Sequence, residues 1–247
     1  LDTGFNCTGP VECAAKVRLA SQNGSDVIKI TATGGVLSQQ GRGLDAHFTN
    51  AEMEAIAQTA AKLGLKVMAH AHGARGIEAA ANAGIATIEH GTYLDAAAAR
   101  AMRENGTVLV PTLMAFQGVT ERLGQGVYTP VVEAKIRQVA EQAQVFMGQA
   151  RQWNVPIAFG TDAGVYPHGD NAKQMPYMVR YGMTPMRAIQ SATLHSAELL
   201  GWEKDTGAIS PDHYADMIAV EGDPLSDISI LSDVKGVIKD GRKVHCE

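Results

Sequence analysis

Four side chains that can bind a metal ion or move a proton lie at the ends of short apolar runs. Asp162 follows residues 155–159 in Gly-Thr-Asp-Ala-Gly, Lys29 lies in Val-Ile-Lys-Ile, and His70 and His90 lie in His-Ala-His-Gly and Ile-Glu-His-Gly. An isolated Gly-Thr-Asp favours an ordinary turn in which the aspartate caps the next segment. The three similar placements upstream favour a site at the ends of several strands, where strands position the chemistry that loops carry.

These residue types suit one kind of site better than others. Two imidazoles and a carboxylate are a ligand set for zinc or a similar borderline metal. Lys29 does not fit that set, because an ammonium cannot ligate a cation and its burial is costly. The residues alone therefore predict a metal site and leave the lysine unexplained.

The spacing of apolar residues and of helix-ending glycines predicts strands that alternate with helices. Strands are predicted at 26–31, 65–69, 86–89, 107–110 and 155–159, and helices at 11–23, 49–62, 74–83, 96–104 and 130–152. Thr49 and Glu52 have the form of a capping box. Two more helices follow Asp162, the second with Thr184 as N-cap and Pro185 at its first position. This alternation favours a parallel sheet with helical crossovers.

The composition changes at residue 206. Short strands are predicted at 216–220, 234–239 and 242–245, with a hairpin turn at Asp240-Gly241. We therefore predict an α/β fold: the later strands, about four to eight, of a (β/α)8 TIM-type barrel over 1–205, and part of a small β-sandwich domain over 206–247. The chain starts at Leu1 in mid-pattern, so we expect it to be the C-terminal portion of a longer protein. In such a barrel the four chemical residues converge at the carboxyl ends of the strands.

Composition limits the partners. The chain has 247 residues, 45% of them hydrophobic, a formal charge of -5 and a pI near 5.9, with no basic run. These values argue against nucleic acid or an anionic membrane as a partner and favour a small molecule. No apolar stretch is long enough to span a bilayer. Cys7, Cys13 and Cys246 form no CxxC, so neither a disulfide framework nor a zinc-thiolate site is predicted.

The order of lysine, histidine, histidine and aspartate on successive strands resembles the amidohydrolase superfamily of metal-dependent hydrolases. The motifs His-Ala-His-Gly, Ile-Glu-His-Gly and Gly-Thr-Asp-Ala-Gly carry this resemblance. Residues 166–173, 188–193 and 214–225 are similar to its branch of dipeptidases and carboxypeptidases of the prolidase-like and Xaa-Arg/Lys type. The resemblance covers nearly the whole chain.

The resemblance implies a binuclear zinc site with a carboxylated lysine. Lys29 would be N-carboxylated and would bridge two Zn²⁺ ions in the complete protein, His70 and His90 would bind one of them, and Asp162 would bind the other. A metal-activated hydroxide would attack the amide carbon. Asp162 would accept its proton and later pass one to the leaving amine.

Three further residues are predicted to bind substrate. His72 is two residues from His70 and faces the same side of a strand. In the related dipeptidases a polar residue at this place meets the substrate's α-carboxylate. The alternative is a histidine tied to a neighbouring loop. Tyr93 and His168 are candidates for the pocket wall, with core packing and a solvated turn as their respective alternatives.

The predicted function is hydrolysis of dipeptides with a basic or prolyl C-terminal residue, by a metalloprotease-like enzyme. One alternative is a cyclic or aryl amide, of the imidazolone or N-acyl amino acid type. Another is an inactive fragment, because the family's paired histidines of the first barrel strand are absent from the chain. We expect this chain alone to bind metal weakly and to show little activity. The expected partner is a small-molecule or dipeptide substrate. Self-association and the choice between cytoplasm and periplasm are left open.

Overall fold

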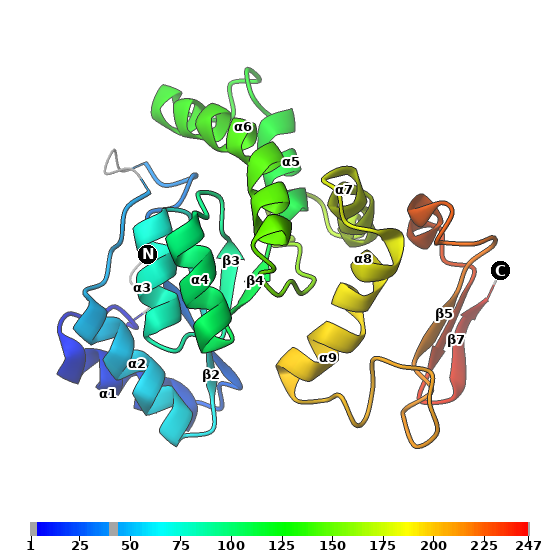
Figure 1. The fold of residues 1–247 in the computed structure, drawn as a ribbon, viewed down its shortest axis with the longest axis horizontal. Coiled ribbons are helices and arrows are strands. Elements are labelled where there is room, and N and C mark those ends of the chain that lie inside the picture. Colours follow the sequence, from blue (N-terminus) through cyan, green and yellow to red (C-terminus); the bar gives the residue numbers. More distant parts are fainter. Residues whose placement is uncertain (1–3, 40–43, 247) are drawn as a thin grey trace. The chain divides into compact units, whose positions relative to one another are not determined.

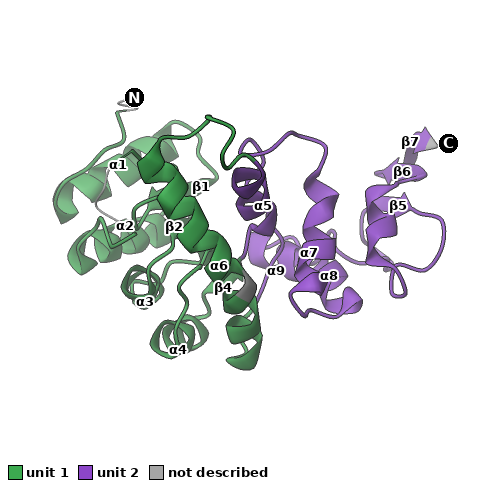
Figure 2. Ribbon diagram, turned by 90° about the horizontal axis from the view of Figure 1, so that it is seen from above, with its two compact units in different colours: residues 1–110, 122–156 green, residues 111–121, 157–247 purple. Residues whose placement is uncertain are grey.

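The computed structural model describes residues 4–39 and 44–246. They fall into two compact units (Figure 2). Unit 1 comprises the residues up to 110 together with 122–156, and unit 2 comprises 111–121 and the residues from 157 onward. The domain boundary predicted at 205/206 stays a prediction. Each unit is described by itself below.

Unit 1 is built on a parallel sheet. Its strands are β1 (Val27–Thr31), β2 (Lys66–Ala71), β3 (Thr87–His90) and β4 (Val108–Val110), in the order β1-β2-β3-β4. The predicted α/β architecture with a parallel sheet is confirmed, and every strand overlaps its predicted range. The register places His70 of β2 opposite Glu89 of β3, which brings polar residues of neighbouring strands to one edge.

Helices α1 (Pro10–Gln22), α2 (Asn50–Lys62), α3 (Ala74–Asn82) and α4 (Ala96–Asn105) pack side by side in chain order (Figure 1). A longer helix, α6 (Pro130–Gln152), completes the unit and has its predicted bounds. Helix α4 ends where Gly106 adopts a left-handed conformation with φ 69°. None of the described helices combines the length and hydropathy needed to cross a lipid bilayer.

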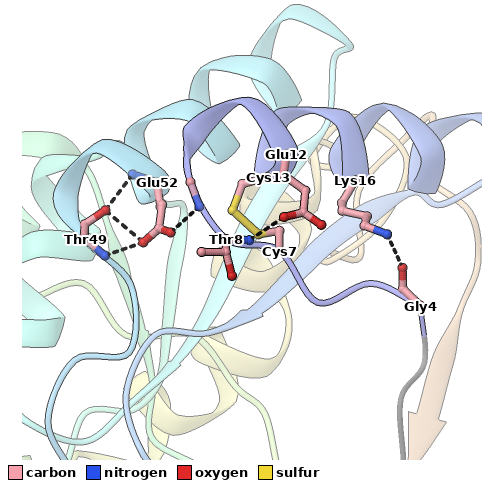
Figure 3. The surroundings of a disulfide bond; sticks show 9 residues. Gly4, Cys7, Thr8, Glu12, Cys13, Lys16, Thr49 and Glu52 are labelled. Carbon is pink, nitrogen blue, oxygen red and sulfur yellow. Dashed lines mark hydrogen bonds between the residues drawn. A yellow bond between two sulfur atoms is a disulfide. The ribbon is translucent and has the colours of Figure 1, made fainter.

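A disulfide ties the segment before α1 to the helix itself (Figure 3). Cys7 and Cys13 are bonded, with Cα atoms 5.0 Å apart, a single disulfide that was not predicted from the sequence. The omission has a geometric cause. The chain turns into α1 between the two cysteines and brings together residues that are six apart in sequence, and CxxC spacing does not report on this.

The predicted capping box of α2 is confirmed and extends to α1 (Figure 3). Glu52 accepts hydrogen bonds from the backbone N–H of Thr49 at 2.7 Å and from the backbone N–H of Gly9 at 2.7 Å. The Thr49 hydroxyl in turn accepts the Glu52 backbone N–H. These hydrogen bonds lower the pKa of Glu52. One carboxylate thus joins the starts of two helices.

We expect Glu52→Gln to lower the free energy of unfolding by about 1–2 kcal/mol at neutral pH, because an amide replaces the charged acceptor of these hydrogen bonds. The folded-state pKa of Glu52 lies below its unfolded value of about 4.3. Its stabilisation is therefore present above that value and is lost as the pH falls through the folded pKa. Urea unfolding at about pH 7 and about pH 3 measures the difference. The exposed Glu54 of the same helix provides the control Glu54→Gln. An equal loss at both pH values would contradict the assignment.

Unit 2 contains helices and a small antiparallel sheet. The helices are α5 (Leu113–Glu121), α7 (Gln174–Arg180), α8 (Pro185–Ala192) and α9 (Leu194–Leu200), with short 3-10 helices at Asn171–Lys173 and Ile228–Ser232. The sheet has the order β5 (Met217–Ala219), β6 (Gly236–Lys239) and β7 (Arg242–Cys246). The Thr184 hydroxyl accepts the backbone N–H of Arg187, as the predicted N-cap requires. Asp240 and Gly241 have φ of 50° and 70° and form the predicted hairpin turn.

Two parts of the prediction are wrong. Residues 155–159 do not form a strand, and Ile157 alone has a bridge. The N–H of Leu109 donates to the carbonyl of Pro156 at 2.8 Å, but proline has no N–H with which to continue a ladder. Helix α5 was not predicted, because it is short, most of its residues are buried, and its polar stripe is limited to Gln117, Thr120 and Glu121 near its C-terminal end. A closed barrel and a complete β-sandwich stay predictions.

Candidate metal centre

Three histidines of unit 1 lie together at the carboxyl end of the parallel sheet. His70 belongs to β2, His72 follows that strand directly, and His90 is the last residue of β3. The ring centroid of His70 lies 4.6 Å from that of His72 and 4.5 Å from that of His90. The His72 and His90 rings are stacked, with their centroids 4.8 Å apart. One ring nitrogen from each lies within 4.8 Å of the others. The expected convergence at the carboxyl ends of strands is observed for these residues.

An unusual backbone turn places His90 in this cluster. Its φ is 74°, a value that residues other than glycine seldom adopt. The N–H of Gly91 donates to the carbonyl of Glu89 at 3.2 Å, which closes a three-residue turn around His90. The same N–H donates to the carbonyl of Ala71 at 3.0 Å and ties the turn to β2. The turn ends the regular alternation of side chains along β3 at His90, the residue that belongs to the cluster.

Hydrogen bonds fix the other two rings. The Nδ1 of His72 is 2.7 Å from the hydroxyl oxygen of Thr92, and both residues are buried. The backbone N–H of His72 donates to the hydroxyl of Thr33 at 2.9 Å. The Nε2 of His70 lies 3.4 Å from the carbonyl oxygen of Gly34. The contact to Thr92 orients the His72 ring, as outer contacts of metal-binding histidines commonly do.

Burial keeps the three imidazoles neutral. It lowers the pKa of His70 to about 4, and it lowers the pKa of His72 and His90 well below the usual value. The positive charge that each ring would impose on its neighbours adds to the effect. Neutral imidazoles retain the lone pair that a metal ion needs, so the cluster is ready to bind one at neutral pH.

Lys29 lies beside the cluster and is paired with a buried carboxylate. Its Nζ is 2.7 Å from Oε2 of Glu89, whose other oxygen accepts a hydrogen bond from the hydroxyl of Thr87 at 2.5 Å. Glu89 is only 5% exposed. The charge of Lys29 contributes to the lowered pKa of both His70 and His90, which places its ammonium near them.

The remaining predicted residues have these positions. Asp162 is exposed in unit 2, in the loop after residue 157, with φ 57° and its carbonyl accepting the N–H of Val165 at 3.5 Å. His168 is exposed in a turn of the same unit. Tyr93 lies in unit 1 just after β3, and its N–H donates to the carbonyl of His72 at 2.9 Å. The Tyr93 hydroxyl is buried without a hydrogen-bond partner. The roles predicted for these residues stay predictions.

The residues present fit a metal ion. The donors are three neutral nitrogens on adjacent strands, held by outer hydrogen bonds, and imidazole nitrogen is a preferred ligand of zinc and related metals. By its position His72 belongs to this set of metal-binding residues, although the sequence predicts that it binds substrate. Zinc binds nitrogen at about 2.0–2.1 Å, so binding requires small rotations of the rings.

Sequence reasoning missed several residues around the cluster. No role is predicted for Glu89 from the sequence, although a carboxylate in a buried strand is a signal for a cationic partner; that partner is Lys29, two strands away in the sheet. Thr92 and Thr33 hold His72, and Lys135 of α6 contacts the loop before Asp45. Only the fold reveals these contacts, because the partners are 20 to 100 positions apart in the sequence.

Comparisons with known proteins agree with this geometry. The sequence profile described as the amidohydrolase family matches residues 3–244. Ochratoxinase of Aspergillus niger is 34% identical over 93% of this chain and 48% of its own length. A Xaa-Pro dipeptidase crystallised with methionine in its active site is 44% identical, with a TM-score of 0.93 over 97% of this chain and 59% of that one.

A prolidase complexed with N-methylphosphonate-L-proline is 29% identical, with a TM-score of 0.90 over 97% of this chain and 60% of that one. The chain thus spans about half the length of the curated relatives it matches. The family match and the relatives cover nearly all of the sequence. The chain belongs to the amidohydrolase family.

Proposed function

We propose that the protein containing this chain is a metal-dependent hydrolase that cleaves the amide bond of dipeptides with a prolyl or basic C-terminal residue. The observation that carries this proposal is the buried cluster of neutral His70, His72 and His90 beside Lys29 on an amidohydrolase scaffold. Similarity to a Xaa-Pro dipeptidase and to a prolidase supports the dipeptide substrate.

Zinc is the metal we propose, with two ions in the complete protein. Bound metal would supply Lewis-acid polarisation of the scissile carbonyl and an activated water molecule. His70 and His90 would hold one ion, with His72 within reach of the same position. Lys29 would serve as a carboxylated, anionic bridge. Carboxylation reverses its charge and would end its ion pair with Glu89.

Asp162 is the proposed proton carrier. Its carboxylate would take a proton from the attacking water and deliver one to the nitrogen of the leaving amine. Its exposure leaves the carboxylate accessible to water and substrate. Tyr93 and His168 are the proposed substrate-binding residues, and His72, for which the sequence also predicts that role, would meet substrate only where His70 and His90 hold the ion without it.

A second candidate function uses the same metal-dependent hydrolysis but acts on a different class of amide. Ochratoxinase at 34% identity and imidazolonepropionase of Shewanella at 26% identity are also relatives of this chain. These similarities favour a larger N-acyl amino acid or a cyclic amide as the alternative substrate. A third reading is a non-catalytic protein that retains these barrel residues only by descent, which metal content would distinguish because a catalytically built site should copurify with zinc.

Substrate profiling of the full-length, zinc-loaded protein tests this proposal. We expect kcat/KM for dipeptides ending in proline, arginine or lysine to exceed that for dipeptides ending in alanine by about 10-fold or more, because a fitted pocket discriminates through several contacts. N-acyl amino acids and a cyclic imidazolone serve as comparison substrates. Preference for one of these would establish the second candidate. Absence of hydrolysis of every dipeptide at saturating metal would refute the proposal.

A further inference from the structure

The loop that follows β1, residues 32–39, lies against the histidine cluster. Within it, the hydroxyl of Thr33 accepts the backbone N–H of His72 at 2.9 Å, and the carbonyl oxygen of Gly34 lies 3.4 Å from Nε2 of His70. Thr33 is fully buried. The loop therefore contacts the ring of one cluster histidine and the backbone of another.

The backbone of this loop packs directly on the ring of His70. A Cβ atom placed on Gly35 would lie 3.5 Å from Nε2 and 3.6 Å from Cε1 of that ring. Gly35 has no such atom, so there is little more than the room of one Cβ between its backbone and the ring, and the observed contact is the Gly34 carbonyl oxygen at 3.4 Å from Nε2. The loop therefore lines one side of the space that the ring occupies. A displacement of the loop would release the ring or force it to turn.

Lys135 of α6 holds the same loop from the other side. Its side chain is buried, with the residue only 9% exposed, and its Nζ donates to the carbonyl of Gly35 at 3.1 Å and to the carbonyl of Ser38 at 2.5 Å. The two carbonyls are three residues apart, so one ammonium fixes the curvature of the loop. Burying an ammonium is unfavourable unless it is well hydrogen-bonded, and burial indeed lowers its pKa.

We propose that Lys135 is a positioning residue for the metal centre. It acts through the 32–39 loop, which sets the orientation of the His70 ring, and it is not itself a metal ligand. The inference rests on the proposed function, because it requires the histidine cluster to bind metal. It extends that function by assigning a control of metal affinity to helix α6, far from the strands in sequence.

Cobalt binding to the full-length protein tests the assignment without relying on activity. Lys135→Met retains much of the side-chain volume and removes the ammonium. We expect the dissociation constant for Co²⁺ to rise about 10- to 100-fold, the range found when outer contacts of metal-ligating histidines are removed. The visible absorption band of bound Co²⁺ should also shift, because His70 changes its angle. Lys135→Arg keeps a cation and should restore part of both.

A matched control is Lys16→Met, which removes another lysine contact to a carbonyl, that of Gly4 at 2.6 Å. It should leave the Co²⁺ affinity and band unchanged. Wild-type affinity and an unshifted band in Lys135→Met would overturn the inference, and so would an equal loss of affinity in the control. If Lys135→Met does not fold, Lys135→Gln replaces it as the variant without the ammonium, and wild-type affinity with an unshifted band in Lys135→Gln would overturn the inference. Failure of the wild-type protein to bind Co²⁺ would refute the proposed function itself.

Discussion

Asp162→Asn is expected to reduce kcat of the full-length protein by about 10²- to 10⁴-fold, the contribution of a general acid-base residue. Asparagine keeps the shape of the side chain and also tolerates the left-handed φ of 57° at this position, so the loop should be preserved. The asparagine amide, however, cannot accept the proton of the attacking water. Steady-state hydrolysis of an Xaa-Pro dipeptide at saturating zinc measures the loss.

Asp170→Asn is the matched control for this variant. Asp170 lies in the same loop region and forms an ion pair with Lys173 at 2.7 Å, and it has no proposed part in catalysis. We expect it to retain kcat within about twofold, as surface ion pairs contribute little. Near-normal kcat in Asp162→Asn would show that another group carries the proton.

Lys29→Ala is expected to lose bound zinc and activity together. A carboxylated Lys29 would be an anionic bridge, and alanine provides no ligand. An unmodified ammonium beside the metals would be repelled by about 8 kcal/mol per Zn²⁺ ion at 4 Å and an effective dielectric of 20, because each ion carries two charges. Acetate or propionate should restore part of the zinc content and the activity by occupying the vacated position. Lys29→Arg should not be rescued, because its guanidinium fills the space and keeps the positive charge.

The ion pair between Lys29 and Glu89 affects how the Lys29→Ala result is interpreted, and its second member, Glu89, provides the control substitution. In the unmodified, metal-free protein, removing Lys29 leaves the buried Glu89 carboxylate without its cation, which destabilises the fold independently of metal. The double variant Lys29→Ala/Glu89→Gln removes that charge. We expect it to recover stability toward urea while zinc remains lost until a carboxylate is added. Full activity of Lys29→Ala without added carboxylate would exclude the bridging role.

Local signals in the sequence predicted much of unit 1 and one helix start of unit 2. The capping box at Thr49 and Glu52, the N-cap at Thr184 and the start of α6 at Pro130 depend on side chains within a few residues of the helix end, and all three are observed. The apolar runs of β1 to β3 each contain or end near a residue chosen for chemistry, namely Lys29, His70 and His90. Contacts between residues that are only a few positions apart can be predicted from the sequence alone.

The remaining errors concern contacts made by the fold. The Cys7–Cys13 bond depends on a chain reversal, α5 is buried around most of its surface, and Pro156 prevents the strand that its apolar neighbours suggest. Within the site, the pattern found His70 and His90 but not the turn that directs His90 toward His70. Nor could it show that Lys135, in another helix, would reach the loop over the cluster.

The most direct test of the account is the metal content of the full-length protein, measured by elemental analysis after purification without chelators. We predict about one or two zinc ions per chain in the wild type and loss of metal in His70→Asn/His90→Asn, since each histidine supplies a ligand to the same ion. Circular dichroism should show that the variant keeps the wild-type fold. Equal metal content in the two proteins, or none in the wild type, would contradict the account.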